Sequence, residues 1–232
     1  MRALILQHED PTPPGLVTEW LDGHGASVET FRIDNEDRKV DPARYDLVVS
    51  LGSEFAAFDD TKPFVPREAA LMRRAVEAEV PVLGLCFGGQ MLARVLGAEV
   101  YRSSDSEIGW LPVRSTDPEM VPEGPWFQWH FDVFALPQGA TLMAETDVGP
   151  QAFVVGRSLG LQFHPEVTTE IMTDWVREYR HELDADGVDP GALLEETKRR
   201  ATESRRMSLH LLEWYLRDVA GLHPGCSRAA LG

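Results

Sequence analysis

A cysteine lies between two glycines in residues 84–88, Gly-Leu-Cys-Phe-Gly, directly after the apolar run 80–85. Such a run is typical of a buried parallel strand, and residues 89–96 have a helical pattern that Gly97 can cap. Strand, tight turn and helix around Gly-x-Cys-x-Gly form the thiol version of a nucleophile elbow. The positive end of the following helix favours an anionic sulfur. We therefore interpret Cys86 as a catalytic nucleophile, with a small buried core cysteine as the alternative.

A second apolar segment ends in a histidine and a carboxylate, within residues 160–166, Gly-Leu-Gln-Phe-His-Pro-Glu. A nucleophilic cysteine needs a base within hydrogen-bond reach, and the base needs an acceptor that orients it. His164 and Glu166 are two residues apart, and Pro165 stiffens the link between them. The order of cysteine, histidine and acid, each at the end of a strand, fits a catalytic triad on an α/β sheet.

These motifs together resemble one enzyme family. The pattern Gly-x-Cys-x-Gly-x-Gln at residues 84–90, followed by His-Pro-Glu at 164–166, is similar to that of the class I (triad) glutamine amidotransferases. Residues 127–132, Phe-Gln-Trp-His-Phe-Asp, also resemble a segment of that family, particularly of its GMP-synthase-like members. The resemblance covers about residues 1–180.

The resemblance implies a two-step hydrolysis of the side-chain amide of L-glutamine. Cys86 would attack the amide carbon, His164 would transfer protons, and Glu166 would orient the imidazole, with a γ-glutamyl thioester between the steps. The oxyanion needs preorganised donors. They would be the backbone N–H of Phe87 and one from Gly52 or Ser53, where the family usually has Gly-Gly-Pro.

The same resemblance implies substrate contacts. Gln90 matches the family position that contacts the amino-acid end of the substrate, although a polar residue in the first turns of a helix is the alternative. Backbone groups around His130, Phe131 and Asp132 would hold the substrate α-carboxylate. The family segment is commonly His-Gly-Asp, so Phe131 replaces a glycine here.

Composition narrows the classes of function. The chain has 232 residues, 43% of them hydrophobic, and a formal net charge of −16. So acidic a chain argues against binding to nucleic acid or to anionic membranes. Two cysteines, Cys86 and Cys226, do not suggest a disulfide framework, so we expect a cytoplasmic protein. We find no cluster of metal ligands and no apolar stretch long enough to span a membrane, and we expect no cofactor.

For several other side chains the sequence gives only a weak indication of a functional role. His8 falls near the edge of the predicted sheet where ligands bind, or it is an ordinary loop histidine. Trp175 and Tyr179 lie four residues apart on a helix, and we interpret them as core packing. The remaining histidines, which have no acidic or thiol neighbours at ligand spacing, are interpreted as structural or exposed: His24, His181, His210 and His223.

The elements that position these residues alternate in the first half of the chain. Strands followed by helices predict crossover connections and a parallel sheet with helices on both faces, as in flavodoxin-like folds. Beyond Gly97 short strands with tight connections predict an antiparallel flank. The expected strands are 2–7, 27–33, 46–51, 80–85, 99–103, 109–114, 126–129, 132–136, 141–145, 151–155 and 159–163, and the expected helices are 16–24, 66–79, 89–96 and 168–183.

We expect residues 1–183 to form the glutaminase domain. Residues 184–190 read as a linker, followed by helices at 190–204 and 207–220 and a frayed tail from Gly221. The added helices either pack on the same domain or serve as a partner contact, a dimer contact or a lid. The oligomeric state is left open.

Three functions remain open at this point. The first is a glutaminase that passes ammonia to an acceptor enzyme or to a separate synthetase subunit, since the sequence has no phosphate-binding loop of its own. The second is a stand-alone hydrolase or transferase acting on γ-glutamyl amides. The third is a regulatory module that binds a ligand without chemistry, which the complete triad disfavours.

Overall fold

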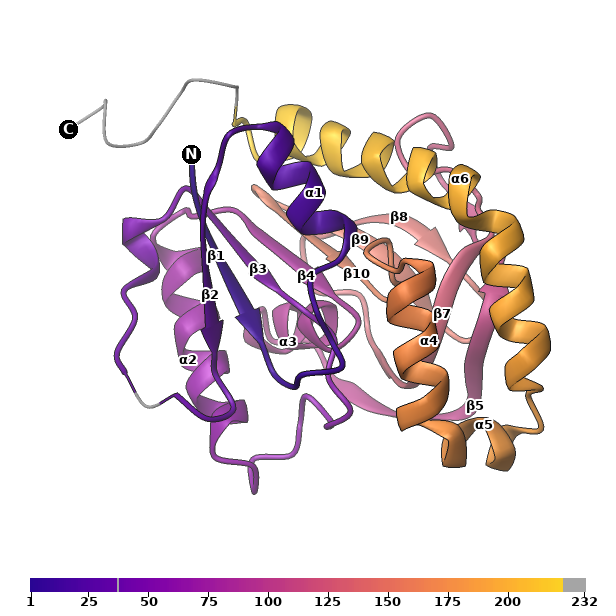
Figure 1. Cartoon of the computed structure of the whole chain (residues 1–232). Coiled ribbons are helices and arrows are strands. Elements are labelled where there is room, and N and C mark those ends of the chain that lie inside the picture. The colour runs from indigo at the N-terminus through magenta and orange to yellow at the C-terminus, as the bar shows by residue number, and fades with distance from the viewer. Residues whose placement is uncertain (37, 223–232) are drawn as a thin grey trace.

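The computed structural model describes residues 1–36 and 38–222, and its centre is one mixed sheet (Figure 1). The strand order is β2-β1-β3-β4-β10-β9-β8-β6. The first five strands in this order run parallel, and β9, β8 and β6 continue the sheet in antiparallel fashion. The parallel sheet and the antiparallel flank predicted from the sequence are thus confirmed. The bounds are β1 Arg2–Gln7, β2 Ser27–Arg32, β3 Leu47–Ser50, β4 Val82–Leu85, β6 Arg114–Ser115, β8 Thr141–Glu145, β9 Pro150–Val155 and β10 Ser158–Leu161.

Helices cover both faces of this sheet because side chains alternate between the faces along each strand. In β1, Ala3 and Ile5 join one core and Leu4 and Leu6 join the other. Helices α1 and α6 pack on the first face, and α2 and α3 pack on the second (Figure 1). The bounds are α1 Leu16–Gly23, α2 Phe64–Glu77, α3 Phe87–Val95 and α6 Pro190–Trp214, and a short turn, η1, covers Pro42–Arg44.

A separate two-stranded ribbon lies beside the main sheet. Strands β5 (Val100–Leu111) and β7 (Trp126–Phe134) pair antiparallel, with a register shift between Arg102 and Glu107. The prediction of two short strands in each of these regions was wrong, because a β-bulge lets a strand continue past a break in pattern. Helices α4 (Thr169–Glu178) and α5 (Arg180–Asp186) pack against the ribbon in a third core.

The C-terminal region also differs from the prediction. Residues 184–186 end α5, Gly187 closes it in a left-handed conformation, and the Asp189 side chain caps α6. The expected linker is therefore only a short turn. The two expected helices form one helix, α6, which a π-helical segment (η2, Tyr215–Val219) extends.

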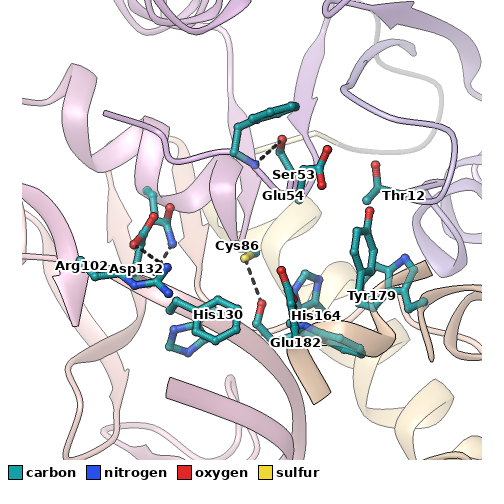
Figure 2. Close-up of a pocket in the computed structure, with 16 residues that line it drawn as sticks. Thr12, Ser53, Glu54, Cys86, Arg102, His130, Asp132, His164, Tyr179 and Glu182 are labelled. Carbon is teal, nitrogen blue, oxygen red and sulfur yellow. Dashed lines mark hydrogen bonds and ion pairs between the residues drawn. The ribbon is translucent and has the colours of Figure 1, made fainter. Parts of the chain in front are cut away.

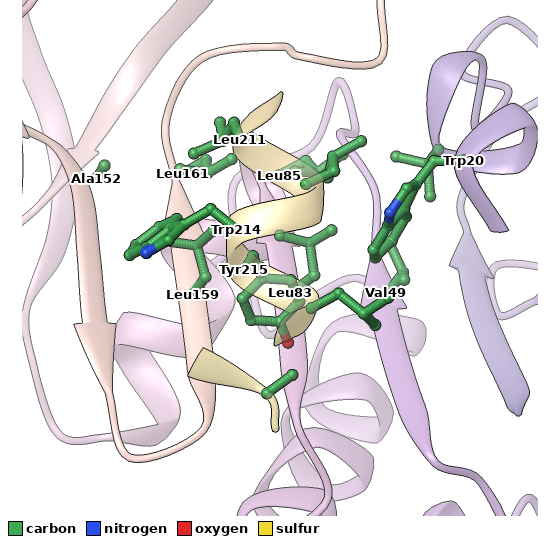
Figure 3. Packing of buried hydrophobic residues seen from close by; sticks show 14 of the residues in the cluster. Trp20, Val49, Leu83, Leu85, Ala152, Leu159, Leu161, Leu211, Trp214 and Tyr215 are labelled. Carbon is green, nitrogen blue, oxygen red and sulfur yellow. The ribbon is translucent and has the colours of Figure 1, made fainter. Parts of the chain in front are cut away.

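Helix α6 is packed into the body of the molecule. Its apolar residues Leu211 and Trp214, with Tyr215 of η2, belong to the same core as Leu159 and Leu161 of β10 (Figure 3). Burying apolar side chains of this size stabilises a fold by about 1.5–3 kcal/mol each. Removal of α6 would therefore expose one face of the central strands. The expected frayed tail lies mostly outside the described residues, as do Cys226 and His223.

Candidate active site

Cys86 occupies the turn between β4 and α3 in a backbone conformation that non-glycine residues rarely adopt. Its φ is 49° and its ψ is −107°. A Cβ added to Gly84 would lie 2.3 Å from the carbonyl oxygen of Gly88, and one added to Gly88 would lie 2.1 Å from that of Ser50. Strand and helix therefore approach too closely for side chains at these glycines. Strain of this kind clusters at functional sites, and here it presents the cysteine at the carboxyl end of the parallel strands.

His164 and Glu166 form a buried hydrogen-bonded pair just after β10. The distance from His164 Nδ1 to Glu166 Oε1 is 2.7 Å, and both side chains are almost fully buried. The edge of the His164 ring meets Trp175 of α4, with 4.9 Å between ring centroids. The imidazole is thus fixed from two sides, and its Nδ1 carries the hydrogen that Glu166 accepts.

The second ring nitrogen of His164 remains open. Nε2 is buried and has no hydrogen-bond partner among the described residues, and the Cys86 side chain lies beside this ring in the pocket (Figure 2). Burial opposes the charged imidazole, but the Glu166 carboxylate and Cys86 outweigh it and raise the pKa of His164 to about 10. A charged imidazole stabilises a neighbouring anionic sulfur.

Two backbone N–H groups near Cys86 are available to a ligand. Phe87 is the first residue of α3, and Ser53 follows Gly52 in the loop after β3. In the described part of the chain neither N–H has a hydrogen-bond acceptor. A Cβ at Gly52 would lie 3.1 Å from His164 Cε1 and 3.8 Å from Cys86 Cβ, so this loop closes directly over the cysteine and histidine.

The helix after the elbow contributes Gln90, which is buried. Its side-chain nitrogen donates to the carbonyl oxygen of Asp132 at 2.9 Å and approaches Gln162 Oε1 at 3.4 Å. Gln162 in turn donates to Cys86 Sγ at 3.7 Å. The sequence analysis did not single out Gln162, although its place two residues before His164 gives it the same side of the chain as the histidine.

The segment predicted to hold the α-carboxylate of the substrate lies in β7. The backbone carbonyl of Trp129 is 3.8 Å from Cys86 Sγ. The His130 side chain is buried and lies 3.0 Å from Glu107, whereas Phe131 stacks under the guanidinium of Arg102. All of Trp129, His130, Phe131 and Asp132 line the pocket.

Asp132 lies next to Arg102, with 3.5 Å between their nearest charged atoms. Burial raises the pKa of Asp132, and Arg102 opposes this rise. Arg102 is largely exposed and lines the pocket, so its positive charge lies at the rim.

One pocket joins these groups (Figure 2). The prediction that Trp175 and Tyr179 pack in a core is confirmed, and the same two side chains also line the pocket, which the sequence did not indicate. The complete lining comprises Thr12, Gly52, Ser53, Glu54, Phe55, Cys86, Gln90, Arg102, Trp129, His130, Phe131, Asp132, His164, Trp175, Tyr179 and Glu182. Their sequence separation, from residue 12 to residue 182, explains why no single motif outlines it.

The part of the chain that the structure describes lacks two features of other classes of protein. Residues 1–36 and 38–222 contain no group of three or more metal-ligating side chains. Within the same ranges no helix has the length and apolar character needed to cross a bilayer.

Similarity to known proteins agrees with the geometry. The chain is 33% identical to a glutamine amidotransferase from Thermotoga maritima, with a TM-score of 0.84 over 94% of this chain and 99% of the other. A glutamine amidotransferase from Methylobacillus flagellatus superimposes with a TM-score of 0.85 at 26% identity, covering 98% of this chain and 97% of the other.

Among sequences, the glutamine amidotransferase-like protein YfeJ of Salmonella typhimurium is 29% identical over 81% of this chain and 85% of its own length. A GMP synthase from Vibrio vulnificus is 28% identical over 62% of this chain, and the match spans 28% of that longer protein. The profile of the family "Glutamine amidotransferase class-I" matches residues 17–178. The chain therefore belongs to the class-I glutamine amidotransferase family.

Proposed function

We propose that this protein hydrolyses the side-chain amide of L-glutamine through a covalent thioester on Cys86. The observation that carries the proposal is the state of His164. Its Nδ1 is held by Glu166, and its buried Nε2 has no other partner among the described residues while Cys86 lies beside it. A base with one oriented nitrogen and one open nitrogen is what an acyl-transfer nucleophile requires.

The first half of the reaction forms a carbon–sulfur bond and releases ammonia. The Cys86 sulfur attacks the amide carbon, and the carbonyl electrons move to the oxygen. The N–H groups of Phe87 and of the Gly52–Ser53 loop stabilise this oxyanion. His164 gives the thiol proton to the amide nitrogen, which leaves as ammonia when the carbon–nitrogen bond breaks.

The second half of the reaction returns the enzyme to its starting state. A water molecule gives a proton to His164 and attacks the thioester carbon. The carbon–sulfur bond then breaks, glutamate leaves, and His164 returns the proton to Cys86. Gln90 and backbone groups around His130, Phe131 and Asp132 hold the amino-acid end of the substrate in this proposal. Arg102 adds positive charge at that end of the pocket.

Ammonia has two possible destinations. Transfer to a separate acceptor enzyme is supported by the match to GMP synthase, whose length exceeds the matched part more than threefold. Release by a stand-alone γ-glutamyl amide hydrolase is supported by YfeJ and the Thermotoga protein, because the chain covers 85% and 99% of them. We propose the glutaminase and keep the hydrolase as the second candidate.

The test compares glutamate and ammonia release from L-glutamine with glutamate and amine release from N-substituted γ-glutamyl amides. Wild type should release glutamate and ammonia in equal amounts, and Cys86→Ala should release neither. Cys226→Ser is the matched control, because it removes the only other cysteine and should retain wild-type rates. A higher kcat/KM for substituted amides would favour the stand-alone hydrolase.

A further inference from the structure

A second buried histidine–glutamate pair lies behind the oxyanion loop, outside the pocket. His8 Nε2 is 2.6 Å from Glu68 Oε2, and the hydroxyl of Ser50 donates to Glu68 Oε1, also at 2.6 Å. All three side chains are fully buried. The catalytic chemistry proposed above uses none of them, yet burying an ion pair costs desolvation energy that its surroundings must offset.

The other nitrogen of His8 connects this cluster to the oxyanion loop. Nδ1 lies 3.0 Å from the carbonyl oxygen of Gly52. A carbonyl only accepts hydrogen bonds, so Nδ1 carries a hydrogen whichever way the proton between His8 and Glu68 is shared. Phe64 and Phe87 pack against the ring, with centroid distances of 5.6 and 4.6 Å, and keep it in this orientation.

This hydrogen bond sets the direction of one peptide group. In a trans peptide the C=O and the following N–H point in opposite directions. Because the carbonyl of Gly52 points to His8, the N–H of Ser53 points away from it. That N–H has no acceptor among the described residues, and both Gly52 and Ser53 line the pocket that contains Cys86.

We propose that His8 is a positioning residue that holds the Gly52–Ser53 peptide so that the Ser53 N–H, together with that of Phe87, binds the oxyanion. Without the clamp the peptide can rotate and turn the Gly52 carbonyl toward the developing negative charge. Glu68 and Ser50 keep the imidazole in place. The inference rests on the proposed amide hydrolysis and adds the identity of the second oxyanion donor.

Three variants test whether His8 holds the Gly52–Ser53 peptide, and all three carry Glu68→Gln. Glu68→Gln alone keeps an acceptor for Ser50 and an N–H donor for His8 Nε2, so it should stay near wild type. Adding His8→Phe keeps an aromatic ring between Phe64 and Phe87 but removes the donor. Adding His8→Asn instead places an amide N–H near the position of Nδ1.

The kinetic expectation follows from the cost of an oxyanion donor, whose removal lowers kcat by about 10²–10³-fold. With the loop displaced but present, H8F/E68Q should lower kcat by about 10- to 100-fold relative to E68Q, and KM for glutamine should change by less than about threefold. H8N/E68Q should recover most of the loss.

A second readout reports the oxyanion site without turnover. L-Glutamate γ-semialdehyde can add to the Cys86 thiol to give a thiohemiacetal, whose oxygen occupies the position of the oxyanion. Its affinity should fall in H8F/E68Q by about the same factor as kcat and recover in H8N/E68Q. Iodoacetamide alkylation of Cys86, which needs no oxyanion donor, should proceed at similar rates in all three variants.

The outcomes separate the two proposals. Wild-type kcat and aldehyde affinity in a folded H8F/E68Q would overturn the clamp and leave the glutaminase standing, as would equal losses in H8F/E68Q and H8N/E68Q. If wild type releases no ammonia, the glutaminase fails, and the ratio of aldehyde affinities still decides the clamp. If H8F/E68Q does not fold by circular dichroism, H8L/E68Q, which also has no side-chain donor at position 8, replaces it with the same expectations.

Discussion

Two buried histidine–glutamate pairs have different roles at this site. His164–Glu166 and His8–Glu68 have nearly equal separations, 2.7 and 2.6 Å, and both are shielded from water. In both, burial opposes the charged imidazole, and the neighbouring carboxylate outweighs burial and raises the pKa of the histidine. Their electrostatics therefore do not distinguish them.

The difference lies in the remaining nitrogen of each ring. His8 has hydrogen-bond partners on both nitrogens, Glu68 and the carbonyl of Gly52. His164 uses only Nδ1 and leaves Nε2 open beside Cys86. A histidine with both nitrogens engaged can hold a backbone group, whereas one with an open nitrogen can exchange a proton. Between these two histidines, the open nitrogen beside Cys86 and not the charge of the ring distinguishes His164 from His8.

The largest contrast should come from the same substitution at the two histidines. His164→Asn removes the general base and should lower kcat for glutamine by at least about 10³-fold. His8→Asn in the E68Q background should stay within about tenfold of wild type, since a loop donor is retained. Steady-state ammonia release measures both. Comparable losses at the two positions would break the distinction.

A smaller contrast is expected at the glutamates. Glu166→Gln keeps the size of the side chain but weakens the orientation of His164, and should lower kcat on the order of 10²-fold with little change in KM. This loss should be less than that of H164N. Glu68→Gln should leave kcat almost unchanged. An equal and total loss in E166Q and H164N would mean that Glu166 does more than orient the imidazole.

The smallest contrast concerns stability against pH. The pKa of His164 is raised from 6.5 to about 10 in the folded protein, so its charged form stabilises the fold fully below pH 6.5. That contribution is lost as pH rises toward 10. Urea unfolding should therefore show a wild-type advantage over H164N that shrinks across this interval. An advantage that stays constant or grows with pH would contradict a charged His164.

The sequence was sufficient to predict the structure where a local pattern of residues determines it. The apolar run before Cys86 and the glycines around it predict the elbow, because Gly84 lies against the backbone of α3 and Gly88 lies against Ser50 of β3, with no room for a Cβ at either position. The predicted β5 and β7 breaks failed for the opposite reason. There the outcome depends on pairing between segments distant in sequence: the β-bulge between Arg102 and Glu107 takes up the extra residues of β5, and the pairing with β7 continues past it.

Side chains whose partners are distant in sequence could not be assigned from patterns. His8 lies 60 residues from Glu68 and 44 from Gly52, and nothing near residue 8 distinguishes it from a loop histidine. Gln162 reaches Cys86, which is 76 residues earlier in the chain, through the pairing of β10 with β4, and Tyr179 reaches the pocket through the placement of α4. The charged residues around position 205 suggested a break between two helices. They lie on the exposed face of α6, which is one continuous helix.

The most direct test of the account is ammonia release from L-glutamine by purified wild type and Cys86→Ala, with Cys226→Ser as control. Wild type and C226S should release glutamate and ammonia in equal amounts, and C86A should release neither. Equal rates in wild type and C86A, or no release from glutamine and every γ-glutamyl amide tested, would contradict it.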